Sequence, residues 1–168
     1  MRSRVYKRPY RPITLTPGRI EPAFPLRRMA EQLMREETFV ATGRDALTLV
    51  HSEQLTAVLT VARRGTTCDA HRLPGPTIIV AITGTLTIAP GAGGHAVRIA
   101  EGDAVGLGSG IDHTVKARRD CAFLTLIGAH DAPRSAGAMH RTPHRATASS
   151  GCPPPAGTPA SPPPRSGA

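Results

Sequence analysis

GTTCDAHRLPGPTIIVAITG, residues 65–84, and GDAVGLGSGIDHTVKA, residues 102–117, are the stretches that decide the fold of this 168-residue chain. Each combines spaced glycines with one histidine: the first reads G-x5-H-x-L-x3-T-x6-G and the second G-x5-G-x-G-x2-H-x3-A. Glycines at such positions mark turns and bulges where a closing β-sheet must bend. Pro74 and Pro76 cannot lie in a central strand because proline lacks an N–H group. The two stretches therefore predict short strands that turn around a shared interior.

This spacing resembles the paired signature of the cupin superfamily, G-x5-H-x-H-x3,4-E-x6-G followed by G-x5-P-x-G-x2-H-x3-N. The matching positions are Gly65, His71 and Gly84 in the first motif and Gly102, Gly110 and His113 in the second. The resemblance covers residues 40–128 and implies a jelly-roll β-barrel built around a pocket. The β-branched run of residues 77–89 and the regular spacing of the other strand candidates favour the same all-β class.

Four motif positions depart from the signature. Leu73 replaces the second histidine, Thr77 the glutamate, Gly108 the proline and Ala117 the asparagine. The first two positions hold metal in the family, so the resemblance leaves His71 and His113 as the candidate metal ligands. A first-row metal needs at least three protein ligands, or two histidines with a carboxylate. A divalent transition metal such as iron, manganese, zinc or nickel is thus an open alternative.

Side chains alternate along a strand, and this alternation predicts which of them share the pocket. Asp69, His71 and Leu73 fall on one face of one strand, and Ile111, His113 and Val115 on one face of another. Asp69 could orient the imidazole of His71, and Thr77 could anchor a ligand. Cys68 falls on the opposite face from His71, which predicts an inert thiol. The expected pocket comprises His71, His113, Leu73, Thr77, Asp69 and Val115.

Composition divides the chain into three segments. Residues 1–28 hold five prolines and eight Lys or Arg, and residues 129–168 are rich in Pro, Ala, Ser and Gly. Neither segment has enough periodic apolar residues to offset the entropy of ordering, so both are predicted to be disordered. Residues 29–128 form the predicted barrel, with a short amphipathic helix that starts at Met29. We expect Met29 to be the true start, with residues 1–28 absent from the native protein.

The net charge of +9 lies in the two end segments. Residues 1–28 carry eight basic side chains and one acidic one, whereas residues 29–128 carry nine and ten, a net charge of −1. A nucleic-acid-binding module would place Lys and Arg on its folded domain and add aromatic residues for stacking. We therefore expect no nucleic-acid binding by the barrel, and at most a non-specific contact through the basic arm.

The sequence contains neither a secretory signal nor an apolar run long enough to span a membrane. Its cysteines, Cys68, Cys121 and Cys152, are odd in number and lack C-x-x-C spacing, which is typical of reduced thiols. Cys121 lies in an apolar run and is predicted to be a core residue. We expect a cytoplasmic protein that does not bind membranes.

Three functions are compatible with these residues. The favoured interpretation is a protein that binds a small molecule in a pocket made more apolar by Leu73 and Thr77. The second is a metal-dependent enzyme, such as a dioxygenase or isomerase, that uses His71 and His113. The third is a metal-free isomerase or epimerase with His71 as a base supported by Asp69. Both tyrosines lie outside the barrel, which weakens the third. The resemblance also implies a homodimer.

Overall fold

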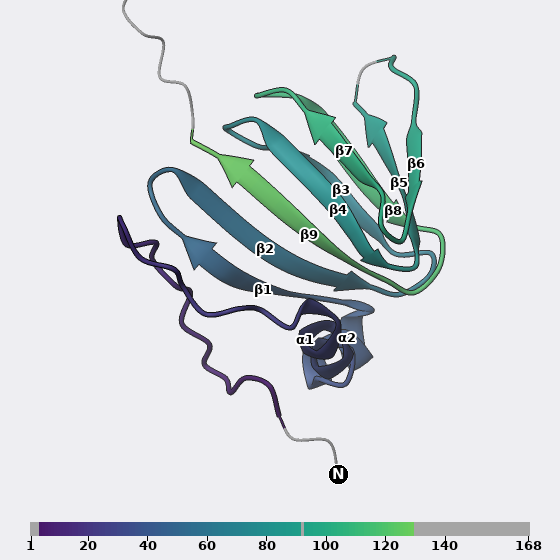
Figure 1. Cartoon of the computed structure of the whole chain (residues 1–168). Coiled ribbons are helices and arrows are strands. Elements are labelled where there is room, and N and C mark those ends of the chain that lie inside the picture. Colours follow the sequence, from purple (N-terminus) through teal and green to yellow (C-terminus); the bar gives the residue numbers. More distant parts are fainter. Residues whose placement is uncertain (1–3, 92, 130–168) are drawn as a thin grey trace, which may run out of the picture. The chain divides into compact units, whose positions relative to one another are not determined.

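The computed structural model describes residues 4–91 and 93–129, except for the side chains of residues 69–71. Within these residues the chain forms two short helices and nine strands (Figure 1). The helices are α1 (Leu26–Leu33) and α2 (Glu37–Thr42). The strands are β1 (Arg44–His51), β2 (Leu55–Ala62), β3 (Thr67–Arg72), β4 (Thr77–Thr83), β5 (Thr85–Pro90), β6 (Val97–Ala100), β7 (Ala104–Leu107), β8 (Asp112–Ala117) and β9 (Cys121–Gly128). The tail predicted over residues 129–168 lies outside the described residues from 130 onward.

The strands form two antiparallel sheets, one of five strands in the order β1-β2-β9-β4-β7 and one of four in the order β3-β8-β5-β6. The chain changes sheet between β3 and β4 and again between β4 and β5. Two antiparallel sheets connected in this way form a jelly roll. The prediction of an all-β jelly roll is confirmed, and the described residues hold nine strands.

Gly84 divides the predicted run of residues 77–89 into β4 and β5. Its φ is +76°, and a Cβ at this position would lie 2.2 Å from the carbonyl oxygen of Asp120. A side chain would both strain the backbone and displace the neighbouring chain, so only glycine fits this corner. The motif glycines Gly65, Gly102 and Gly110 also have positive φ. The spacing of the glycines in the two motifs therefore indicates the positions at which the backbone turns.

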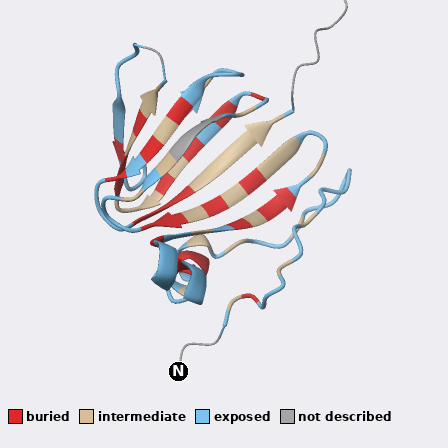
Figure 2. Cartoon of the chain, turned by 180° about the vertical axis from the view of Figure 1, so that it is seen from behind, coloured by how far each residue is buried: buried red, intermediate tan, exposed pale blue. Residues whose placement is uncertain are grey.

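Hydrophobic side chains pack on both faces of the five-stranded sheet. Its inner face meets the four-stranded sheet, and the buried residues there include Ile79, Leu86, Ile99, Val115 and Phe123. Its outer face packs against α1 and the N-terminal arm, through residues that include Leu47, Leu59, Val61 and Ala122. Bands of buried and partly buried residues alternate along β2 (Figure 2), which therefore contributes to both layers.

The predicted amphipathic helix is present, but it begins at Leu26, three residues before Met29. Met29, Ala30 and Leu33 are buried and belong to the core on the outer face of the five-stranded sheet. The chain then forms α2, which ends at Gly43 with a left-handed φ of +74°. The two helices of the described residues have eight and six residues and are too short to cross a lipid bilayer.

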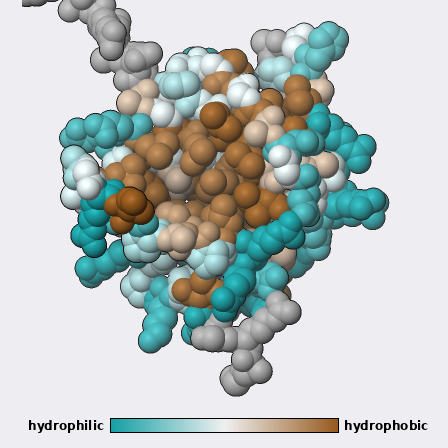
Figure 3. All heavy atoms as spheres, in the orientation of Figure 1, coloured by the Kyte–Doolittle hydropathy of each residue, from teal (hydrophilic) through white to brown (hydrophobic). Residues whose placement is uncertain are grey.

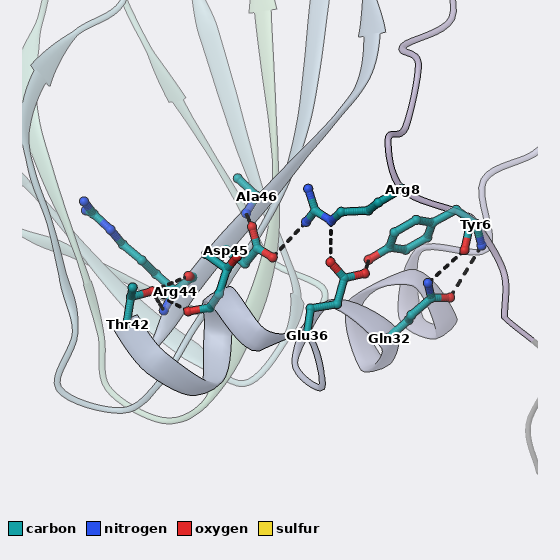
Figure 4. Close-up of polar contacts among 9 residues, drawn as sticks. Tyr6, Arg8, Gln32, Glu36, Thr42, Arg44, Asp45 and Ala46 are labelled. Atoms are coloured by element: carbon teal, nitrogen blue, oxygen red, sulfur yellow. Dashed lines mark hydrogen bonds and ion pairs between the residues drawn. The ribbon is translucent and has the colours of Figure 1, made fainter.

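Specific contacts fasten the N-terminal arm, residues 4–25, to α1 and β1 (Figure 4). Tyr6 is 6% exposed, and its hydroxyl donates a hydrogen bond to Oε1 of Glu36 at 2.6 Å. Arg8 forms ion pairs with Glu36 and, at 2.8 Å, with Asp45. Farther along the arm, Ile13 forms a parallel bridge to β1.

Gln32 of α1 also holds the main chain of the arm. Its Nε2 donates to the carbonyl oxygen of Tyr6 at 2.9 Å, and its Oε1 accepts a hydrogen bond from the amide of Val5 at 2.8 Å. The predicted disorder of residues 1–28 therefore does not describe residues 4–28. Composition and periodicity led to that prediction, whereas the arm is held by one buried aromatic side chain and by polar contacts with distant residues.

Candidate binding cavity

A cavity of about 170 Å³ lies between the two sheets. Six apolar residues line it, namely Val58, Leu73, Ile79, Val115, Phe123 and Ile127. Four residues with polar atoms complete the lining, namely Thr60, Cys68, His113 and Thr125. They come from β2, β3, β4, β8 and β9 and from the turn that follows β3. The jelly roll thus brings together side chains from five strands around a small, mostly apolar space.

His113 is the most deeply buried polar residue of this lining, with 1% of its surface exposed. It lies on β8, where alternation turns His113 and Val115 inward. Its Nδ1 donates a hydrogen bond to the carbonyl oxygen of Ile111 at 3.1 Å, since a carbonyl can only accept. In the neutral ring Nε2 then carries the lone pair. His113 is therefore a fixed imidazole whose Nε2 can accept a hydrogen bond.

The backbone register brings the two motif histidines to opposite positions on neighbouring strands. His71 of β3 pairs with His113 of β8, and Cys68 pairs with Val115. The strands that carry the two motif histidines are therefore neighbours in the four-stranded sheet. The side chains of Asp69 and His71 lie outside the described residues, so their predicted roles stay predictions.

Cys68 lines the cavity, so its predicted position on the opposite face is wrong. The cause is a bulge between Cys68 and His71, where Asp69 and Ala70 oppose Thr114 alone. One extra residue shifts the alternation, which brings Cys68 into register with an inward-facing partner. The same bulge removes the simple alternation that placed Asp69 on the face of His71.

The two residues at the altered ligand positions have different roles. Leu73 lines the cavity. Thr77 is buried outside that lining, and its hydroxyl donates to the carbonyl oxygen of Gly75 at 3.1 Å. The hydroxyl thus closes the turn before β4, and the roles of both residues toward a ligand stay predictions. Ile111 precedes β8 and is 42% exposed, so it does not share the face of His113.

The cavity-lining side chains of the described residues do not make a ligand set for a metal. Two of them, the imidazole of His113 and the thiol of Cys68, could donate to a metal, whereas Leu73 offers no donor atom. Among the residues whose side chains are described, no three His, Cys, Asp or Glu are grouped for metal binding. A first-row metal needs a third ligand, so no metal chemistry is derived for this cavity.

Half of the lining comes from residues that the motifs do not contain. Val58 and Thr60 lie on β2, and Phe123, Thr125 and Ile127 lie on β9. These two strands are neighbours in the five-stranded sheet, with Val58 paired to Thr125 and Thr60 to Phe123. The alternating sequences of β2 and β9 predict that one face of each strand is buried, but which face lines the cavity depends on how the strands pair.

Cys121 is buried as predicted, and burial raises the pKa of its thiol to about 12.

The two sheets and the cavity between them define a small jelly-roll barrel. No protein-family model matches the chain, and no curated protein matches it. A solved cupin superfamily protein from Desulfitobacterium hafniense is 14% identical, with a TM-score of 0.53 over 71% of this chain and 99% of that one. A variant of salicylate 1,2-dioxygenase from Pseudoaminobacter salicylatoxidans is 16% identical, with a TM-score of 0.52 over 61% of this chain and 31% of that one.

The chain therefore carries a domain with the cupin fold, as the two motifs predicted. The same fold is found in a dioxygenase several times as long as the matched segment. At this level of identity the likeness defines the fold, and the function must be argued from the cavity.

Proposed function

We propose that this protein binds a small, mostly apolar molecule in the cavity between the sheets. The observation that carries the proposal is the 170 Å³ space between the sheets, in which His113 is buried among mostly apolar walls. An apolar cavity of about 150 Å³ is known to hold benzene. The space thus suits one six-membered ring with a small substituent.

The polar residues of the cavity lining determine which chemical group the ligand can carry as its substituent. Nε2 of His113 accepts a hydrogen bond in the neutral ring, so a hydroxyl group that donates to it fits best. A charged group is less suitable because its burial here would lack an opposite charge among the described lining residues. The proposed ligand class is therefore a small alcohol or phenol with an apolar body.

Phenol, cyclohexanol and benzene test this proposal by calorimetry and by thermal shift of the full chain. Ile79→Phe would fill the cavity, whereas Val97→Phe adds bulk on β6 outside the cavity, where Val97 is 44% exposed. We expect saturable binding of phenol that Ile79→Phe abolishes and Val97→Phe leaves within about twofold. His113→Leu should weaken phenol about tenfold and benzene little.

Absence of saturable binding by all three probes would contradict the proposal, as would unchanged binding by the folded Ile79→Phe variant. Cys68 supplies an independent measurement because its thiol lines the same cavity. Phenol should slow modification of Cys68 by a small thiosulfonate. The fully buried Cys121 serves as the internal reference for unfolding.

We also propose that two copies of the chain associate through the outer face of the five-stranded sheet. Leu126 pairs with Ile78, and Leu124 pairs with Val80, so these four side chains form two adjoining cross-strand pairs. The space-filling view shows hydrophobic residues gathered over β2, β9 and β4 with a hydrophilic rim (Figure 3). Such a self-complementary apolar face suits a twofold dimer.

Sedimentation of two matched variants tests this association. Ile78→Arg should convert the dimer to a monomer. Val97→Arg introduces the same charge on β6, where Val97 is 44% exposed, and should leave the dimer intact. A monomeric wild-type protein at micromolar concentration would contradict the proposal.

A further inference from the structure

A row of polar residues crosses the outer face of the four-stranded sheet. Thr67 pairs with Lys116, Lys116 with Thr87, and Thr87 with Arg98, so the row runs over β3, β8, β5 and β6. Residues that are directly opposite share a face of the sheet. Lys116 and Arg98 are two strands apart, about 10 Å at the usual strand spacing. The sheet thus presents the hydroxyl of Thr87 with one cation on each side of it, Lys116 and Arg98.

Two more cations, Arg64 and Arg118, lie beside this row. Arg64, Arg98, Lys116 and Arg118 line one shallow, open depression of the surface, together with Thr87. Nε of Arg118 donates to the hydroxyl oxygen of Thr87 at 2.9 Å, which holds this guanidinium beside the row. Among the described residues that line the area there is no carboxylate. The carboxylate of Asp120 lies beside this area and accepts a hydrogen bond from the amide of Arg64 at 2.7 Å, so the four cations of the lining outnumber this neighbouring carboxylate.

A second depression, between the arm and the helices, has a mixed lining, so a lining with cations alone is not general on this surface. That second depression is lined by arginines and glutamates together, and its Arg8 forms ion pairs with Glu36 and Asp45. Positive charge is balanced there by neighbouring carboxylates. On the four-stranded sheet the described lining residues have one sign, and a concave area of one sign attracts ligands of the opposite charge.

We propose that this area binds a small molecule that carries several phosphate charges. Guanidinium and ammonium groups are the side chains that recognise phosphate oxygens, and the row places them far enough apart to contact different phosphates of one molecule. Among the described lining residues no aromatic side chain offers a stacking surface for a base. A compact polyphosphate suits the area better than a single-stranded nucleic acid.

Calorimetric titration of the full chain with inorganic tripolyphosphate tests this site at about 0.1 M salt, where charges farther than ~10 Å apart are largely screened. The variant Arg98→Gln/Lys116→Gln removes two cations from the row. The control Arg11→Gln/Arg19→Gln removes two exposed cations from the arm. We expect the first variant to weaken binding at least about tenfold and the control less than about twofold.

If both variants weakened tripolyphosphate binding equally, the proposal would be overturned, because the loss would then depend on the net charge of the protein and not on this area. Failure of the wild-type protein to bind tripolyphosphate at millimolar concentration would overturn it as well. A single-stranded oligothymidine is titrated in parallel. If it binds through Arg98 and Lys116 while tripolyphosphate does not bind, the ligand is a nucleic acid and the small-molecule assignment is wrong. Unchanged thermal unfolding of the variants shows that the barrel is intact.

Discussion

Replacement of Tyr6 measures how firmly the N-terminal arm is held. Truncation of a buried aromatic side chain costs about 3–5 kcal/mol in a rigid core. The arm can relax around the loss, so we expect Tyr6→Ala to lower the free energy of unfolding by about 3 kcal/mol. Tyr6→Phe removes only the hydrogen bond to Glu36. A bond to a charged acceptor is worth about 1.5–3 kcal/mol, and Arg8 still pairs with this carboxylate, so we expect about 1.5 kcal/mol.

Urea unfolding of the full chain converts these values into midpoints. With an m value of roughly 1.5 kcal/mol/M, Tyr6→Ala should lower the midpoint by about 2 M and Tyr6→Phe by about 1 M. Tyr10→Phe is the matched control, since the ring of Tyr10 packs edge-on against Tyr6 and no hydroxyl bond of Tyr10 is observed in the described residues. It should change the midpoint by less than about 0.3 M. A Tyr6→Ala midpoint equal to that of the wild type would refute the packing of the arm.

Three further predictions concern the core and the turns. Burial raises the pKa of Cys121 to about 12, so the thiol of the unfolded chain ionises at lower pH than that of the folded protein. The contribution of Cys121 to the free energy of unfolding should be constant below pH 8.5 and then fall by up to about 1.4 kcal/mol per pH unit. Cys121→Ala should remove this decline when unfolding is measured as a function of pH. Gly84→Ala should cost at least about 3 kcal/mol in urea because its Cβ would meet a backbone oxygen, whereas Gly102→Ala, with open space around it, should cost about 1–2 kcal/mol from its positive φ alone. A chain shortened to begin at Met29 should lose more stability than Tyr6→Ala; equal midpoints would show that only Tyr6 matters in the arm.

The parts of the fold that the sequence predicted are those in which one residue type meets a local backbone requirement. Gly65, Gly84, Gly102 and Gly110 all have positive φ, so their spacing reports turns directly. Alternation then failed at the bulge after Cys68, because an extra residue in one strand depends on its pairing with β8. No pattern within residues 65–84 shows that bulge.

The contacts of the arm and half of the cavity wall could not be predicted, since both depend on residues far apart in the chain. Tyr6 and Glu36 are 30 residues apart in the chain, so only the folded protein brings them into contact. Val58 reaches the cavity through its pairing with Thr125, and the sequence of either strand alone does not state that pairing. Long-range partners of this kind are specified by the packed fold and not by local composition.

The two altered ligand positions show how a conserved spacing can keep a fold while it changes a site. Leu73 contributes an apolar wall to the cavity, where the family signature has a histidine. Thr77 instead binds the carbonyl oxygen of Gly75, in a turn so close to β9 that a Cβ on Gly75 would lie 2.0 Å from the carbonyl oxygen of Gly128. A glutamate at position 77 would lack this hydroxyl, so the turn before β4 would lose its hydrogen bond to the carbonyl oxygen of Gly75. Leu73→His alone should therefore make the cavity more polar and weaken benzene binding, whereas a carboxylate at position 77 would also remove the hydroxyl that closes the turn before β4.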